Sequence, residues 1–285
     1  MTTAILITAA LLPALVLCIY IFKKDRVEKE PIGLLIKLLV FGAISCIPIA
    51  IVSSAVCDII DQNFIPYGSL GADGSITLPD TLYYLYHLIT NFVGVGLIEE
   101  SGKFLFLYLI TKNNKEFNSL FDGLIYAIFV SLGFAALENI LYVLQNGFYV
   151  AIMRAVLSVP GHMFFAVMMG YYYSLWHIHK KAGMMEETLK RNGIVPVSTP
   201  SFTYGKYIFS CVLIPTLAHG FYDFSCSIDD SWSLLILLAF VVFMYVYCFG
   251  KIKKMSKKDA PTHNYAKVIL LKKYPTAQEY ILNNF

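Results

Sequence analysis

The sequence predicts an all-α polytopic membrane protein with about seven transmembrane helices, its N-terminus outside and its C-terminus in the cytoplasm. Of its 285 residues, 58% are hydrophobic and only 14% are charged, and the mean hydropathy is +0.65. A soluble domain usually carries about 25% charged residues. The composition therefore indicates that much of the chain faces lipid, as in a multi-pass protein of the cell membrane.

Seven apolar segments are long enough to cross a bilayer core of about 30 Å, which takes roughly 20 residues of helix. They are 4–22, 33–57, 82–111, 121–145, 148–176, 206–226 and 232–250. The first segment has the length of a signal peptide, but Lys23, Lys24 and Arg26 follow it and no basic residue precedes it. This order is the reverse of a secretory signal, so we expect a retained helix.

The basic residues give the orientation, because cytoplasmic loops carry an excess of Lys and Arg. Outside the apolar segments, the Lys and Arg residues fall in alternate connections, namely 23–32, 112–118, 177–206 and the chain after 250. The intervening connections 58–81, 146–147 and 227–231 carry none. This alternation predicts that the N-terminus lies outside and the C-terminus inside.

Two units are expected: a membrane-embedded domain at 1–250 and a basic cytoplasmic tail at 251–285. Anionic lipid headgroups are an expected partner of the tail, through Tyr265–Lys273, and a solvated tail that helps to fix the topology is the alternative. The loop 177–205 is expected to hold a short polar helix at 184–191. The net charge of only +3 gives no footprint of nucleic-acid binding.

Ionisable side chains occur inside the predicted spans, where each unpaired charge costs about 2.5–3.5 kcal/mol on insertion scales. Spans three to six hold Glu99, Glu100, Lys103, Glu138, Arg154, His162, His219 and Asp223. These groups must face one another, a metal or water, and the default interpretation of such a set is functional. We expect them to line one cavity open to the outer face.

Helical spacing gathers these residues into stripes, because positions three and four apart share a face. The stripes are Glu99 with Lys103, Phe134 with Glu138 and Tyr142, and His219 with Asp223. His162 follows Pro160, which removes a backbone hydrogen bond and loosens the helix. Structural interpretations remain open for single residues: a buried ion pair explains Glu99 with Lys103 equally well, and Arg154 fits a partner for Glu138 or Asp223.

Four motifs in order resemble those of the PrsW family of intramembrane proteases. They are Glu99-Glu100-Ser101-Gly102-Lys103 (EExxK), Phe134 to Tyr142 (FxxxExxxY), Arg154 eight residues before His162, and His219 to Asp223 (HxxxD). The resemblance covers about 82–226. In the similar clan of CAAX prenyl endopeptidases and bacteriocin-processing proteins, His stands in place of Glu138 and Arg in place of Lys103, so both departures favour PrsW.

The resemblance implies an intramembrane endopeptidase with its catalytic core in spans three to six. It implies site-1 cleavage of a membrane-anchored anti-sigma factor on the outer side, so a single-span membrane protein is the expected substrate. The expected catalytic residues are Glu99, Glu100, Glu138, His162, His219 and Asp223, with Lys103, Arg154 and Tyr142 in supporting roles.

Peptide hydrolysis needs an activated water, an electrophile for the carbonyl oxygen and an acid for the leaving amine. Glu99 or Glu100 is the expected general base. For the histidines two roles stay open. In one, His162, His219 and Glu138 (or Asp223) bind zinc, although HExxH is absent. In the other, the two histidines form a metal-free oxyanion hole.

A proton- or ion-coupled transporter, or a seven-span sensor, is the alternative function, because such proteins also bury Glu, Asp and His. Transporters often contain inverted repeats, and the sequence shows none. The protease prediction is therefore preferred.

Overall fold

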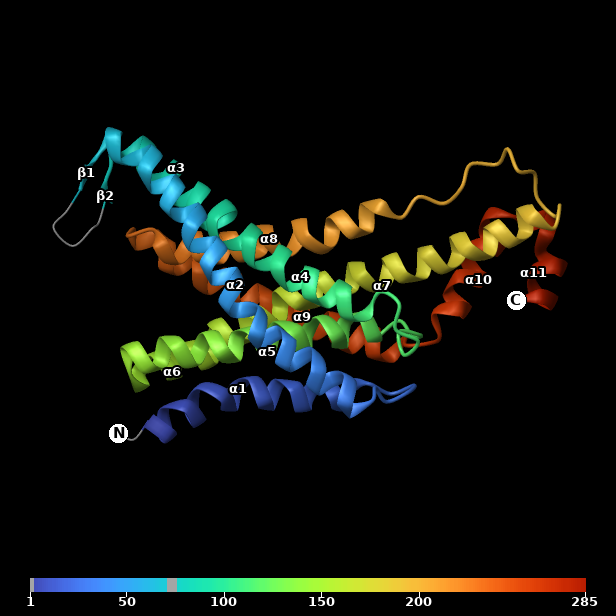
Figure 1. Ribbon diagram of the computed structural model, residues 1–285, viewed down its shortest axis with the longest axis horizontal. Helices are drawn as coiled ribbons and strands as arrows, with labels where there is room; N and C mark the ends of the chain where they lie inside the picture. Colours follow the sequence, from blue (N-terminus) through green and yellow to red (C-terminus); the bar gives the residue numbers. More distant parts are fainter. Residues whose placement is uncertain (1–2, 71–75) are drawn as a thin grey trace.

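The computed structural model describes residues 3–70 and 76–285, which are almost entirely helical (Figure 1). The long helices are α1 (Thr3–Lys24), α2 (Ile32–Phe64), α5 (Asp122–Asn146), α7 (Ser158–Arg191), α8 (Gly205–Ser227) and α9 (Ser231–Lys257). Three further segments follow one another without a break: α3 (Asp80–Ile89), the π-helical η2 (Thr90–Leu97) and α4 (Ile98–Thr111). The remaining helical elements are α6 (Phe148–Val156), α10 (Thr262–Lys273), α11 (Gln278–Asn284) and the 3₁₀ turns η1 (Ile65–Tyr67) and η3 (Pro275–Ala277).

Within the described residues, five helical stretches are long and apolar enough to cross a membrane. They are α1, α2 with η1, α5, α6 with α7, and most of α9. The predicted spans 82–111 and 206–226 correspond to α3–η2–α4 and to α8. These two stretches carry Glu99, Glu100, Lys103, His219 and Asp223 and are less apolar. A multi-pass membrane protein is confirmed, and the total of seven spans stays a prediction.

The outward faces of the bundle are apolar, as lipid contact requires. On α9 the exposed side chains include Leu234, Leu238, Val242 and Val246, which are 48–72% exposed. A continuous apolar face of this kind is unusual on a soluble monomer. Contact with acyl chains explains it.

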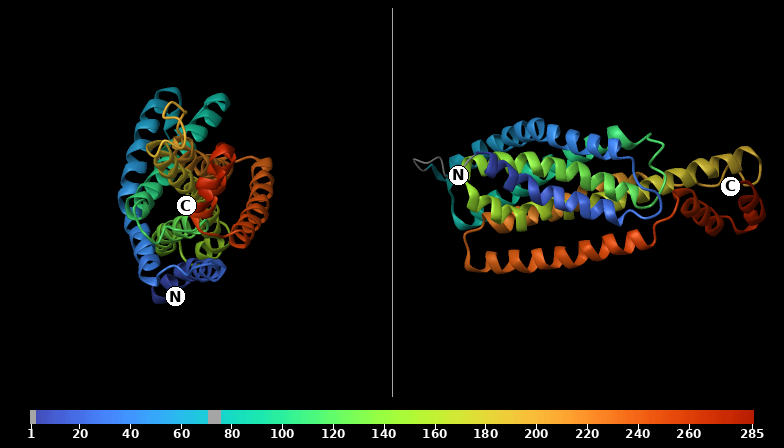
Figure 2. Two further views of the ribbon diagram at one scale, coloured as in Figure 1. Left: turned by 90° about the vertical axis from the view of Figure 1, so that its right-hand side faces the viewer. Right: turned by 90° about the horizontal axis from the view of Figure 1, so that it is seen from below.

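The two termini lie at opposite ends of an elongated bundle (Figures 1 and 2). At the end that also holds the N-terminus, here the hairpin end, β1 (Ser69–Leu70) and β2 (Ile76–Thr77) pair antiparallel. At the other, here the tail end, lie α10, α11 and the C-terminus. The connections 25–31 and 112–121 also lie at the tail end, so the structure gathers the basic connections on one side of the bundle.

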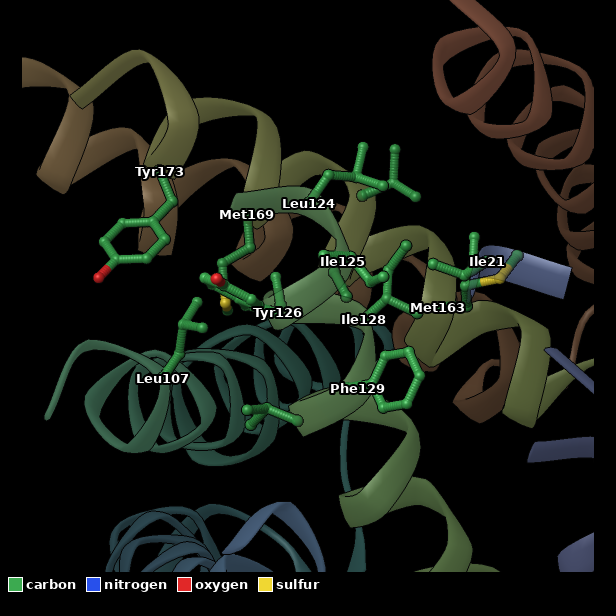
Figure 3. Close-up of a cluster of buried hydrophobic side chains, with 14 of the residues drawn as sticks. Ile21, Leu107, Leu124, Ile125, Tyr126, Ile128, Phe129, Met163, Met169 and Tyr173 are labelled. Carbon is green, nitrogen blue, oxygen red and sulfur yellow. The ribbon is translucent and has the colours of Figure 1, made fainter. Parts of the chain in front are cut away.

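Helix α5 forms the centre of the bundle and packs against α1, α2 and α7. Its side chains Leu124, Ile125 and Ile128 are fully buried in the main apolar core (Figure 3). Where α5 crosses α2 the backbones almost touch, because a Cβ added at Gly133 would lie 2.0 Å from the carbonyl oxygen of Leu39. The absence of a side chain at Gly133 thus sets the closest approach of these helices.

The predicted fifth span, 148–176, is broken between α6 and α7 at Leu157. Pro160 lacks the N–H that would bond to the carbonyl of Val156, so α6 ends at Val156. In α7 the same proline lies in the first turn, where a missing N–H costs little. The break places Arg154 and His162 on separate helices.

The prediction for the loop 177–205 is correct in part: residues 184–191 are helical, but they belong to α7. No separate helix forms at 184–191, because α7 runs unbroken to Arg191 and projects beyond the bundle (Figure 1). Its extension is apolar on one side, where Ala182, Met185 and Leu189 are buried against α10 and η3. These contacts explain why the helix continues.

The tail is folded against this extension rather than extended in solvent. Leu270 and Ile281 are fully buried in the small core that it forms with α7. Glu186 on α7 is buried and accepts hydrogen bonds from Lys273 Nζ (2.6 Å) and from the backbone N of Phe202 (3.0 Å). The chain from 251 to 285 therefore has a fixed structure at the tail end.

The tail end of α5 is held by two other segments. Asp122 Oδ2 accepts a hydrogen bond from the backbone N of Asn118 (2.8 Å), and Asn118 O accepts one from the backbone N of Thr262 (2.7 Å). Tyr126 OH donates to Glu30 Oε2 (2.7 Å) in the α1–α2 connection. Burial raises the pKa of Glu30 to about 9, and the facing Asp122 adds to this. The position of α5 in the bundle is fixed by these contacts.

Candidate active site

A cavity of about 400 Å³ lies in the half of the bundle near the hairpin end, between η2, α4, α5, α6, α7 and α8. The predicted site residues that line it are Glu99, Glu138, Tyr142, Arg154, His162, His219 and Asp223. They come from segments more than 120 residues apart in the chain. The structure thus brings seven of the predicted site residues to one cavity, whereas Glu100 and Lys103 are fully buried beside it and do not line it.

The π-helical segment η2 leads directly into the glutamate pair. Its side chains Asn91 and Val95 line the cavity together with Glu99, at intervals of four residues. π-Helical turns are rare and frequently occur at functional sites. Glu99 has an 11% exposed side chain, whereas the side chain of Glu100 is fully buried. The two neighbouring carboxylates therefore differ in their access to the cavity.

Lys103 holds the glutamate pair. Its Nζ donates hydrogen bonds to Glu99 Oε2 (3.0 Å), Glu100 Oε1 (2.8 Å) and His162 Nδ1 (3.2 Å). The same ammonium lies 4.2 Å from the centre of the Phe134 ring, a cation–π contact. Lys103 is fully buried, so this charge is compensated by its partners and not by water.

His162 is oriented by the groups on either side of its ring. Since the Lys103 ammonium has no lone pair and can only donate, Nδ1 must accept the hydrogen bond from it. The proton of the neutral ring then lies on Nε2, which donates to Glu138 Oε2 (3.0 Å). Glu138 also forms an ion pair with Arg154, whose guanidinium lies 4.1 Å from the centre of the Tyr142 ring. The predicted Glu138, Arg154 and Tyr142 are thus neighbours.

His219 is surrounded by carboxylates. Its Nδ1 donates to Glu100 Oε1 (2.9 Å), and its Nε2 lies 3.2 Å from Asp223 Oδ2 and 3.9 Å from Glu99 Oε2. Phe165 stacks on the ring with a centroid distance of 4.7 Å. Because Nε2 faces only acceptors, it either carries a second proton or shares a cation with the carboxylates.

The cluster has an excess of negative charge. Its four carboxylates belong to Glu99, Glu100, Glu138 and Asp223, and its two permanent cations to Lys103 and Arg154. With neutral histidines, two negative charges remain uncompensated in a site of low polarity, which is costly. A divalent cation, or protons on the cluster, would balance them.

The donor set fits a metal ion. One ligand atom each from Glu99, Glu100, His162 and His219 lies within 4.8 Å of the others, and Glu100 Oε2 is buried without a hydrogen-bond partner. Two histidines and a carboxylate form a known catalytic zinc set. Each histidine also directs one N–H at a buried carboxylate, the arrangement that orients metal-ligating imidazoles.

Several cavity residues were not identified from the sequence. Asn91, Tyr222 and Ser227 line the cavity, and Ser227 Oγ donates to Asn91 Oδ1 (3.2 Å). Asn139, next to Glu138, is fully buried and accepts a hydrogen bond from Arg154 Nε (2.9 Å). A buried asparagine in the middle of a span is the signal that could have revealed it.

The approach of α8 to η2 determines where His219 lies. A Cβ added at the adjacent Gly220 would lie 2.6 Å from the Phe92 ring and 2.8 Å from the Phe92 Cα. Such contacts cannot form without a shift of the helices.

Gly220→Ala is therefore expected to move His219 away from Glu100 and to lower the cleavage rate by about 10²-fold, since a misplacement near 1 Å has effects of this size. Cleavage by purified protein measures it. The control is Gly250→Ala on α9, where an added Cβ meets no atom within 4 Å. Equal rates in the two variants would show that the close approach has no role in the reaction.

Comparisons with known proteins agree with this geometry. Residues 30–249 match the model of the PrsW family, described as an intramembrane metalloprotease family. Protease PrsW of Clostridioides difficile is 30% identical over 249 residues, covering 86% of this chain and 89% of its own. Protease PrsW of Geobacillus kaustophilus is 30% identical (87% and 91% covered), and that of Bacillus subtilis 26% (87% and 94%). No solved structure matches.

The family match spans α2 to α9 and includes every residue of the cavity described above. It also includes the four motifs, of which the Phe134 to Tyr142 motif and the pair Arg154 and His162 lie on helices that are apolar enough to cross a membrane. The resemblance predicted from the motifs is confirmed: the chain belongs to the PrsW family of intramembrane proteases.

Proposed function

We propose that this protease hydrolyses a peptide bond of a single-span membrane protein on the outer side of the membrane, and that its natural substrate is an anti-sigma factor cleaved at site 1. The observation that carries the proposal is the cavity near the hairpin end, in which Glu99, His162 and His219 converge. A peptide segment entering from the outer face would meet these groups within the bundle.

Glu99 is the proposed general base, because it lines the cavity while Glu100 is fully buried. It accepts a proton from a water molecule whose oxygen bonds to the carbonyl carbon of the substrate. The C–N bond then breaks, and the amine leaves with the proton that Glu99 had taken up. Glu100 holds His219 through Nδ1 and Lys103 through its Nζ.

The electrophile for the carbonyl oxygen comes from the two histidines, directly or with a metal. Without a metal, N–H groups of His162 and His219 would donate to the oxyanion. For His162 this requires the N–H at Nε2 to turn from Glu138 to the substrate, because Nδ1 accepts a hydrogen bond from Lys103. A bound zinc would polarise the carbonyl and lower the pKa of its water to about 7. His162 Nδ1 and His219 Nε2 would hold it, since their other nitrogens donate to Glu138 and Glu100.

The third metal ligand in this proposal is a carboxylate of the Glu99–Glu100 pair, and the other member stays free to act as base. The hypothesis from the sequence names Glu138 or Asp223 for this place. The contacts favour a different role for Glu138, because it accepts a hydrogen bond from His162 Nε2 and forms an ion pair with Arg154. Lys103 occupies His162 Nδ1, so a metal there would displace its ammonium.

The orientation is part of the proposal: the hairpin end faces outward and the tail end faces the cytoplasm. The basic connections at the tail end support it through the positive-inside rule. A reporter fused after residue 70 is expected to be external, and one fused after residue 190 or at Phe285 cytoplasmic. Alkaline phosphatase and fluorescent protein fusions measure this, and a cytoplasmic signal at residue 70 would contradict the orientation.

The tail is proposed to contact anionic lipid as well as α7. Its Lys267 and Lys272 lie on α10, close to the tail end of the bundle, where the headgroups of the inner leaflet would be. Surface lysines near such a leaflet each gain about 1 kcal/mol.

Purified protein in liposomes, incubated with a single-span substrate, tests the proposed function. Mass spectrometry of the products should locate the cleaved bond on the outer side of the substrate span. An intact substrate, or the same products from Glu99→Gln protein, would reject the assignment. An anti-sigma factor and an unrelated single-span protein in parallel reactions test the substrate class.

A further inference from the structure

Asn139 on α5 occupies one of the unspecified positions of the Phe134 to Tyr142 motif, and it contacts Arg154 of the proposed site. It is 0% exposed and follows Glu138 directly. A buried amide in a membrane-spanning helix is costly unless both its donor and its acceptor are used. Both ends of this amide have partners.

The two partners of Asn139 lie on different helices. Its Oδ1 accepts a hydrogen bond from Arg154 Nε on α6 (2.9 Å). Its Nδ2 donates to the backbone carbonyl of Ala10 on α1 (2.7 Å). The amide thus connects α1 to the guanidinium of Arg154.

The carbonyl of Ala10 lies within the helix α1. Pro13 removes the intrahelical donor of the Ala9 carbonyl, four residues earlier, so it does not free the carbonyl of Ala10. A carbonyl oxygen has two lone pairs, so Ala10 O can accept from the Asn139 amide as well as from the backbone of its own helix. Ala10 itself is fully buried against Val143 and Ala151, so α1 holds this carbonyl in place.

Arg154 connects Asn139 to Glu138, which lines the cavity. Its Nε bonds to Asn139 while a terminal nitrogen of the same planar group bonds to Glu138. A guanidinium that is hydrogen-bonded at two of its three nitrogens has a defined orientation. Glu138 Oε2 in turn accepts a hydrogen bond from His162 Nε2 (3.0 Å). The chain of contacts therefore runs from Ala10 to His162 through three side chains.

We propose that Asn139 is a positioning residue for the protease reaction, and that it uses α1 to hold Arg154 against Glu138. Helix α1 begins before the region shared with the family model, residues 30–249. On this proposal it is a structural part of the active site and more than a membrane anchor. The inference rests on the proposed function, because Glu138 and His162 are assigned to the reaction there.

Asn139→Leu removes both hydrogen bonds at similar volume and tests the proposal. We expect kcat to fall by about 10–100-fold, the usual effect of losing an orienting partner, with KM nearly unchanged. If Asn139 acts through Arg154, the Asn139→Leu/Arg154→Ala double variant should be no slower than Arg154→Ala alone. Accumulation in the membrane and thermal unfolding in detergent report on folding.

Val143→Ala is the matched control. Val143 lies one turn further along the same face of α5 and packs against α1 in the cluster with Ala10. Loss of the Val143 methyl groups should weaken the packing of α1. Any fall in the cleavage rate should be independent of Arg154, so that the fold-changes of Val143→Ala and Arg154→Ala multiply in the double variant.

The outcomes separate the two proposals. Full activity of Asn139→Leu, or a loss that multiplies with Arg154→Ala, would overturn the role of Asn139 and leave the proposed function intact. Full activity of both Arg154→Ala and Glu138→Gln would overturn the proposed site together with this inference. Non-additive loss at Asn139, with a multiplicative effect at Val143, supports the inference.

Discussion

Glu99→Gln is expected to lower kcat for substrate cleavage by about 10²–10⁴-fold, the usual contribution of a general base. The amide keeps the size of the side chain and can still accept a hydrogen bond from Lys103 Nζ, which lies 3.0 Å from the present carboxylate. It cannot take a proton from water. KM should change little, because the substitution removes chemistry and not substrate contact area.

The control is Glu187→Gln on α7, the same chemical change at a side chain that is 71% exposed. It should cleave at the wild-type rate. Glu100→Gln, His162→Ala and His219→Ala should also abolish cleavage while the protein accumulates in the membrane, and Glu138→Gln should be severe. Wild-type rates in both the Glu99 and the Glu100 variants would contradict the assignment of a glutamate base.

The differing environments of the two adjacent glutamates explain why this experiment is informative. Glu99 reaches the cavity, whereas Glu100 contacts Lys103 and His219 in the interior. Glu100→Gln should therefore also disturb the position of His219. The fall in cleavage rate of the Glu100→Gln/His219→Ala double variant should then be smaller than the product of the two single effects.

The sequence predicted the membrane class and the gathering of ionisable residues at one cavity because both depend on simple rules. Lipid requires long apolar helices, and it penalises charge so strongly that the ionisable residues in spans three to six stood out. Four-residue spacing then placed Glu138 beside Tyr142, and His219 beside Asp223. The structure places all four side chains at one cavity.

Other features depend on contacts between distant segments and could not be predicted. The extension of α7 to Arg191 is stabilised by Leu270 and Ile281, which lie about 80 residues further along the chain. The bonding of Lys103 to His162 as well as to its own glutamates depends on how α4 and α7 pack. Asn139 could be interpreted only once Ala10 and Arg154 were placed on either side of it.

The charge of the cluster connects the fold to the question of the metal. Burial of Lys103 among Glu99, Glu100 and His162 puts one cation where three ligand atoms converge. Two negative charges of the cluster still lack a permanent partner. Since unpaired buried charge is costly, the cluster should bind either protons or a divalent cation, and the two alternatives predict different responses to a chelator.

Removal of metal from detergent-purified protein is expected to stop cleavage, and added zinc should restore it. The reason is that His162 Nδ1 and His219 Nε2 would bind zinc as neutral ligands in the proposed site, next to a glutamate carboxylate. Elemental analysis should give about one zinc per chain, because residues 3–70 and 76–285 contain one group of converging ligands. The zinc content should fall well below this in His219→Ala.

His179→Ala is the control for metal content. His179 lies outside the cavity, where its Nε2 is 3.1 Å from Tyr207 OH. This variant should retain zinc and activity. If the histidines act instead as oxyanion donors, the chelator should leave the rate unchanged, while His162→Ala and His219→Ala each still lose about 10²–10³-fold. Because both mechanisms require the same two histidines, the metal content together with the chelator response decides between them. Full activity without stoichiometric metal would leave a protease that depends on Glu99.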